Sequence, residues 1–192
     1  MALETQLTEL DRLGFKIVSR SDNRVIGVRQ KWHWDCIATK LTYIIFVRAI
    51  DELTRADIDM DRADLLSRAH ELDPSILPRG FQKGTAIIAA YVATKVRADA
   101  REQCTTKQKR RFAFFYFPTA REASSDTTFY LKETPLWGAI YFGKFRYLAQ
   151  CLLDPHRAPK QEPISKLGAT LSIFLLLWFV ILLLGVLGTL LS

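Results

Sequence analysis

The stretch from Leu167 to Ser192 contains no ionisable side chain. An α-helix rises about 1.5 Å per residue, so a helix of this length can cross the roughly 30 Å of hydrocarbon in a bilayer. A buried helix of a large core is the alternative, but such helices usually carry some polar residues. The sequence therefore predicts a single transmembrane helix over residues 167–192.

The charges around this stretch predict its orientation. His156, Arg157, Lys160 and Lys166 precede it, and no basic residue follows it. Because basic residues favour the cytoplasmic side, the long N-terminal part is expected to stay in the cytoplasm. A C-terminal span would be inserted after translation, as in tail-anchored proteins. The N-terminal sequence contains acidic residues and lacks a continuous apolar core, so no secretory signal is predicted.

The rest of the chain is basic. All 27 Lys and Arg and all 20 Asp and Glu precede the apolar stretch, so the net charge of +7 belongs to this part. A basic domain beside an anionic leaflet gains roughly 1 kcal/mol per basic residue near the surface, which predicts membrane lipid as a partner. Nucleic acid is the alternative. Cys36, Cys104 and Cys151 are too widely spaced for a metal motif and are expected to be reduced thiols.

Periodicity and turn residues predict one α/β domain over residues 1–153, with a mixed α+β sheet as the alternative. A linker over residues 154–166, with three prolines, would join it to the helix at 167–192. The domain is expected to follow a helix-β-β-β-helix-β order, with an antiparallel meander first and parallel strands later. Expected helices cover 3–13, 54–72, 97–105 and 143–153. Expected strands cover 15–20, 24–32, 36–48, 85–94, 111–117, 127–132 and 136–142, with a loop at 75–84 and turns at 118–126.

This order of elements resembles the core of the restriction-endonuclease-like fold over about residues 3–95. In that family, a carboxylate and an E-x-K motif hold a magnesium ion. The resemblance implies Asp35 and Lys40 as the counterparts, with Glu4 as a further acid. Since Ala38 stands where the family has glutamate, the metal would lack a ligand. The resemblance therefore implies the fold without nuclease activity.

Residues 110–117, Arg-Arg-Phe-Ala-Phe-Phe-Tyr-Phe, resemble the RNA-recognition-motif consensus, although arginine replaces the expected glycine at position 111. A two-sided core strand explains the same aromatic run. The basic residues beside it are candidates for binding an anion or lipid, or for a solvated face. They are Lys107, Lys109, Arg110 and Arg111.

The segment Trp32-His33-Trp34-Asp35 combines aromatic and polar residues at a strand end. It suggests a binding edge, a membrane interface or the rim of the core. The chain contains no G-x-S-x-G, Walker, G-x-G-x-x-G or H-E-x-x-H motif, which counts against the common hydrolase, NTPase and nicotinamide classes. No cofactor and no metal site are predicted.

These observations predict a non-enzymatic, cytoplasm-facing interaction or scaffold domain, held in a membrane by its C-terminal helix. A partner protein or a second copy of the chain is the expected partner. One alternative is a membrane effector whose basic domain binds nucleic acid or a small anionic ligand. Another is a degenerate endonuclease-like domain, since a metal-dependent nuclease is the least unlikely activity.

Overall fold

A six-stranded mixed sheet forms the centre of the structure, a computed structural model that describes residues 3–36, 39–69, 71–73, 83–109, 114–136 and 138–191. The strands lie side by side in sequence order. They are β1 (Lys16–Arg20), β2 (Arg24–His33), β3 (Thr39–Leu53), β4 (Lys83–Val96), β5 (Phe114–Glu122) and β6 (Thr127–Phe129). The predicted α/β class and helix-β-β-β-helix-β order are confirmed.

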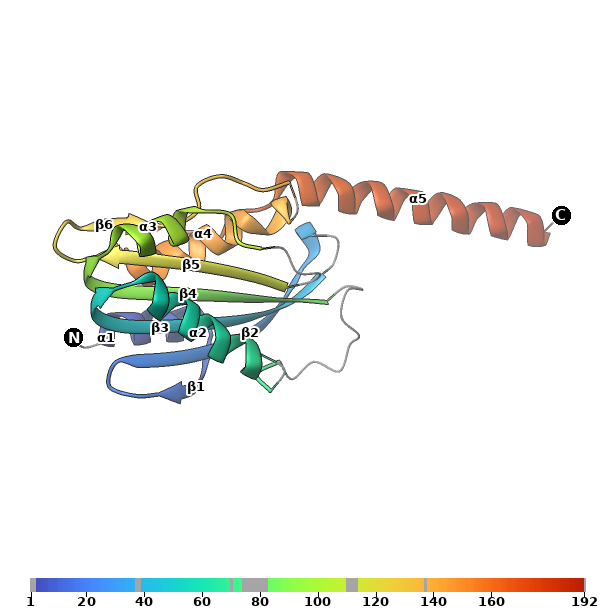
Figure 1. The fold of residues 1–192 in the computed structure, drawn as a ribbon. Helices are drawn as coiled ribbons and strands as arrows, with labels where there is room; N and C mark the ends of the chain where they lie inside the picture. Colours follow the sequence, from blue (N-terminus) through green and yellow to red (C-terminus); the bar gives the residue numbers. More distant parts are fainter. Residues whose placement is uncertain are drawn as a thin grey trace.

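Helices cover both faces of the sheet (Figure 1). They are α1 (Glu4–Arg12), α2 (Arg55–Arg68), α3 (Ala98–Thr105), α4 (Ala139–Leu153) and α5 (Lys166–Leu191), with a 3₁₀ turn, η1 (Trp34–Cys36). The first core cluster lies between the sheet and α1 and α4, and the second between the sheet and α2 and α3. In contrast, α5 extends away from the domain, roughly along the direction of the strands (Figure 1).

The strand directions follow the predicted pattern. β1, β2 and β3 form an antiparallel meander, while β3, β4 and β5 are parallel. β3 lies in the middle of the sheet, and its side chains alternate between the two cores. Tyr43 and Ile45 face α1 and α4, whereas Ile44 and Phe46 face α2 and α3. Because both faces are covered, the strand is apolar without alternation.

The helix after β3 begins where its capping residue predicts. The Thr54 hydroxyl accepts a hydrogen bond from the Asp57 amide at 3.2 Å, and an Asp57 carboxylate oxygen accepts one from the Thr54 amide at 3.1 Å. This reciprocal capping box satisfies backbone donors that the first turn of a helix leaves unpaired.

Two predicted segments are wrong in part. The expected turns at 118–126 are confirmed only over 123–126, because β5, which contains Pro118, continues to Glu122. Proline is tolerated there because β6 pairs only with Ala120–Glu122, so Pro118 lies at an edge where its missing N–H breaks no ladder. Of the expected strand at 136–142, residues 139–142 are instead the start of α4, whose aromatic residues pack into the core at helical spacing, and Trp137 lies outside the described residues.

Several boundaries also differ. The strand expected at 36–48 is β3, which begins at Thr39 and continues to Leu53, since Cys36 belongs to η1. The strand expected at 127–132 is β6, which ends at Phe129. β4 begins at Lys83, inside the expected loop. Residues 37–38, 74–82 and 110–113 lie outside the described residues, so the expected loop at 75–82 and the start of the strand at 111 stay predictions.

Candidate functional site

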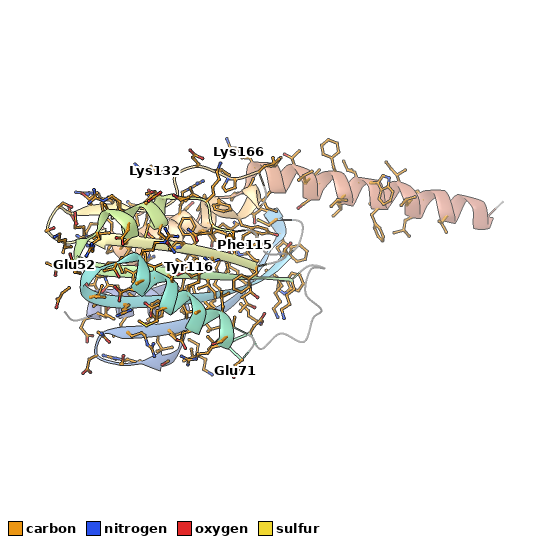
Figure 2. All side chains as sticks on the ribbon, in the orientation of Figure 1. Glu52, Glu71, Phe115, Tyr116, Lys132 and Lys166 are labelled. Atoms are coloured by element: carbon orange, nitrogen blue, oxygen red, sulfur yellow. The ribbon has the colours of Figure 1, made fainter. Side chains whose placement is uncertain are left out.

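α5 is the apolar helix that the sequence predicts. The mean hydropathy of its most apolar window within Lys166–Leu184 is 2.7, and only 6% of that window is buried. Its side chains project into open space beyond Lys166 (Figure 2). Within the described part of the chain, it is the one helix whose length and composition allow it to cross a membrane.

The base of α5 is packed against η1. The Ser165 amide donates a hydrogen bond to the Asp35 carboxylate at 2.8 Å, and the Ser172 hydroxyl donates one to the Trp34 carbonyl oxygen at 2.8 Å. At Gly168, an added Cβ would lie 1.9 Å from the Asp35 carbonyl oxygen. Only glycine allows this approach, so the first two turns of α5 are held beside the end of β2.

Below this contact lies a group of five charged or titratable residues, which we call the clamp cluster. Its members are Lys31, His33, Asp35, Lys144 and Glu162. Lys144 Nζ lies 2.8 Å from an Asp35 oxygen and 3.7 Å from a Glu162 oxygen, and Lys31 pairs with Glu162. Lys144 also donates a hydrogen bond to the Pro163 carbonyl oxygen at 3.2 Å. The cluster therefore fastens the segment before α5 to β2, η1 and α4.

Burial and charge fix the protonation of the cluster. Burial, aided by the positive charge of Lys144, lowers the pKa of His33 from 6.5 to about 4. Burial alone would raise the pKa of Asp35, but hydrogen bonds from Lys144 and the Ser165 amide outweigh it and hold that pKa below its ordinary value. The pKa of Glu162 is likewise lowered, since its bond to Lys31 outweighs burial. At neutral pH, the cluster therefore holds a neutral histidine and two balanced ion pairs.

Two members of the clamp cluster, His33 and Lys144, are too enclosed to act on a substrate, whereas the side chain of Lys31 is 43% exposed. The side chain of His33 is 2% exposed and that of Lys144 is 4% exposed. His33 Nε2 lies 2.8 Å from the hydroxyl oxygen of the buried Tyr43. A general acid or base must reach the proton that it transfers. We therefore interpret the cluster as a structural connection between the domain and α5.

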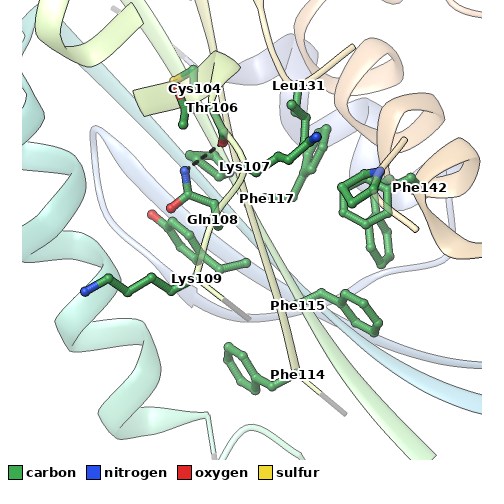
Figure 3. Close-up of a pocket in the computed structure, with 14 residues that line it drawn as sticks. Cys104, Thr106, Lys107, Gln108, Lys109, Phe114, Phe115, Phe117, Leu131 and Phe142 are labelled. Carbon is green, nitrogen blue, oxygen red and sulfur yellow. Dashed lines mark hydrogen bonds between the residues drawn. The ribbon is translucent and has the colours of Figure 1, made fainter. Parts of the chain in front are cut away.

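A second feature is an aromatic pocket at the edge of β5 (Figure 3). Its cavity is about 130 Å³. Phe114, Phe115, Phe117 and Phe142 contribute rings to its wall. Among the residues that the structure describes, no strand pairs with this edge of β5 before Ala120, where β6 begins to pair. An apolar cavity beside such an edge can accept side chains of an added extended segment.

Two of the predicted basic residues border this pocket. Lys107 and Lys109 are both exposed, and Lys107 lies 3.1 Å from Glu133. Lys109 points away from the rings toward α2 (Figure 3), where a neighbouring cavity of about 410 Å³ is also lined by Arg55 and Arg62. Arg110 and Arg111 lie outside the described residues, so their place in a basic cluster stays a prediction.

The described aromatic residues of β5 do not lie on an open sheet face of the kind on which the RNA-recognition motif stacks bases. Phe114 packs against the core formed with α2 and α3, whereas Phe117 belongs to the core formed with α1 and α4. Because helices cover both faces, this part of the strand is a two-sided core strand.

The three nuclease candidates do not meet. Glu4 begins α1 and lies 3.3 Å from Arg20 at the end of β1, whereas Asp35 lies at the opposite end of β2 beside Lys144. Lys40 pairs in register with Trp32 and Lys83. Across the residues described, no group of three His, Cys, Asp or Glu side chains is close enough to hold a metal ion.

Sequence reasoning missed Lys144 and Glu162. A signal for Lys144 was present, because it follows Tyr141 by three residues and precedes Leu148 by four, which places it on the apolar face of its helix. Glu162 carries no such signal, since it lies among prolines in an irregular segment.

The comparisons with known proteins add no assignment. No protein-family model matches the sequence, and no curated protein matches it.

Proposed function

We propose that this protein is a membrane-anchored interaction module, in which α5 crosses a bilayer and the α/β domain recruits a partner protein. The observation that carries this proposal is the exposure of α5, whose apolar window is only 6% buried. Water does not solvate a helix of mean hydropathy 2.7 favourably, whereas lipid does. Holding the domain at a membrane raises its effective concentration toward other membrane-bound proteins, so weak contacts suffice.

We place the domain on the cytoplasmic side. Arg157, Lys160 and Lys166 directly precede the apolar part of α5. Basic residues that flank a span favour the cytoplasmic side of the membrane.

The membrane anchor is tested by alkaline carbonate extraction and by protease protection. We expect the chain to stay in the membrane pellet and the domain to be digested only from the cytoplasmic side. Leu177→Lys with Ile181→Lys should release the chain, because each lysine at a helix centre costs about 2.5–3.5 kcal/mol. The control Ser124→Lys with Gln161→Lys adds the same charge on the exposed domain surface and should stay in the pellet. Release of both variants, or of neither, would contradict the proposal.

We assign the partner surface to the aromatic pocket and the free edge of β5. An extended segment with apolar side chains and flanking acidic residues fits the rings, the unpaired strand and the exposed Lys107 and Lys109. A photo-crosslinking residue at position 109 should give a discrete adduct in native membranes. The same residue at the exposed position Asp22, in the turn between β1 and β2, should give none. Crosslinked adducts of equal yield at positions 109 and 22 would contradict the assignment of the partner surface to the β5 edge.

A second candidate function is the binding of an anionic ligand or nucleic acid. The observation that favours it is the cavity lined by Arg55, Arg62, Lys107 and Lys109, although Asp59 and Glu102 also line it. Binding of RNA, DNA or anionic vesicles should then weaken steeply with salt and fall in Lys107→Glu with Lys109→Glu. No binding at low salt would contradict this second function, and partner recruitment would remain as the proposed function.

A further inference from the structure

Exposed apolar side chains gather around the base of α5. Trp32 is 44% exposed, Trp34 75%, Leu136 92% and Ile164 74%. We call these four residues the apolar collar. Trp32 and Trp34 flank the clamp residue His33, and Ile164 precedes Ser165, which is bonded to Asp35. Leu136 lies just before α4, whose residue Ile140 accepts a bond from Cys36 of η1 at 3.5 Å.

The contacts between η1 and α5 fix the level of this collar along the helix. The Trp34 carbonyl oxygen accepts a bond from Ser172, so the domain accompanies α5 up to that residue. The remaining helix from Ile173 to Leu191 is about 28 Å long at 1.5 Å per residue. This length matches the roughly 30 Å hydrocarbon layer of a bilayer. If this part fills the layer, the collar lies at its boundary.

Resting on the proposed function of α5 as an anchor, we propose that the apolar collar sits in the headgroup interface of the same bilayer. Tryptophan is enriched at this level of membrane proteins, where its ring meets both apolar and polar groups. The Trp32 and Trp34 rings are stacked with centroids 6.3 Å apart, so they present one joint apolar surface. The domain is then seated on the membrane in one orientation, with its strands roughly along the membrane normal.

Depth-dependent quenching of tryptophan fluorescence tests this arrangement in the full chain, reconstituted in phosphatidylcholine vesicles. One variant keeps only Trp34, through Trp32→Phe, Trp137→Phe and Trp178→Phe; a matched variant keeps only Trp178 of α5. We expect lipids brominated near the headgroup to quench Trp34 more than lipids brominated deep in the chains. Trp178 should show the opposite order.

The outcomes separate the two proposals. If Trp178 is quenched by deep bromine while Trp34 responds to aqueous iodide and to neither lipid, the collar is not at the membrane and the anchor stands. If neither tryptophan responds to lipid, the anchor fails and the collar fails with it. A Trp34→Cys variant with an environment-sensitive label repeats the measurement where the triple substitution disturbs folding. The native Cys36, Cys104 and Cys151 are buried and do not compete for the label.

Discussion

Single residues decide how the domain and its helix are joined. Lys144 lies in an apolar helix face and is nearly fully buried, yet it reaches both Asp35 and Glu162. A protein with a buried ion pair is often no more stable than one in which apolar residues replace both partners. Removing only one partner is strongly destabilising, because it leaves an uncompensated buried charge. The clamp cluster is therefore the place where one substitution should have a large effect.

Replacing the buried lysine tests this asymmetry. Lys144→Met should lower the free energy of unfolding by about 3–5 kcal/mol, because Asp35 and Glu162 lose the cation between them. Urea unfolding of the full chain in detergent micelles, followed by circular dichroism, measures this change. The control Lys132→Met removes an exposed lysine and should change stability by less than about 0.5 kcal/mol. A similar loss of unfolding free energy in both variants would contradict the role of Lys144 in the clamp cluster.

The buried histidine makes stability depend on pH. The pKa of His33 is about 4 in the folded protein and 6.5 ordinarily, so between these values the unfolded chain binds a proton that the folded chain does not. The free energy of unfolding should therefore have its full value above pH 6.5 and fall by about 3 kcal/mol as the pH drops to 4. The lowered pKa values of Asp35 and Glu162 add a loss of the same sign at lower pH.

Unfolding curves across this pH range check the prediction. In His33→Gln, the loss between pH 6.5 and pH 4 should shrink, because glutamine does not titrate. An unchanged slope would assign the pH dependence to other groups.

At the scale of elements, hydrophobic periodicity and capping residues were sufficient to predict most of the sheet and α2. The buried run of β3 and the Thr54 cap are local signals, and their elements form where these signals lie. Aromatic residues misled the prediction at the start of α4, because Tyr141 and Phe142 suit a strand by propensity but belong to the helix and pack against its core cluster. Contacts of the clamp cluster join segments far apart in sequence, which no local pattern reveals.

The close approach of α5 to η1 depends on Gly168. An alanine there would place its Cβ 1.9 Å from the Asp35 carbonyl oxygen, so the first turns of α5 must move away. We expect Gly168→Ala to speed tryptic cleavage at Arg157 and Lys160 in membrane-bound protein. Gly143→Ala is the control, because its Cβ would meet Pro163 at an ordinary 3.6 Å. Equal cleavage rates would show that the contact does not hold the segment.

The capping box of α2 gives a smaller effect. Thr54→Ala removes the acceptor of the Asp57 amide and should cost about 1 kcal/mol of stability. Ser124→Ala, at an exposed turn, is the matched control and should be near neutral. Both are measured by urea unfolding, and a loss in Thr54→Ala no larger than in the control would contradict the cap's role.

For the whole molecule, the boundary of the folded unit lies inside the base of α5. A chain of residues 1–172 keeps the clamp cluster and the Ser172 contact, while residues 1–160 lack Glu162 and Ser165. We expect the longer fragment to be soluble, folded and more stable. The shorter one should melt at a lower temperature, because Lys31 and Lys144 lose their Glu162 partner. Equal melting temperatures, measured by circular dichroism, would contradict this boundary.

The alignment of α5 with the strands restricts how two copies in one bilayer can associate (Figure 1). If two free β5 edges paired antiparallel, a two-fold axis perpendicular to the strands would relate the chains. That axis would send the two α5 helices in opposite directions, away from a shared bilayer. Under the proposed anchoring, copies side by side would therefore meet through another surface, and the β5 edge would stay available to the proposed partner.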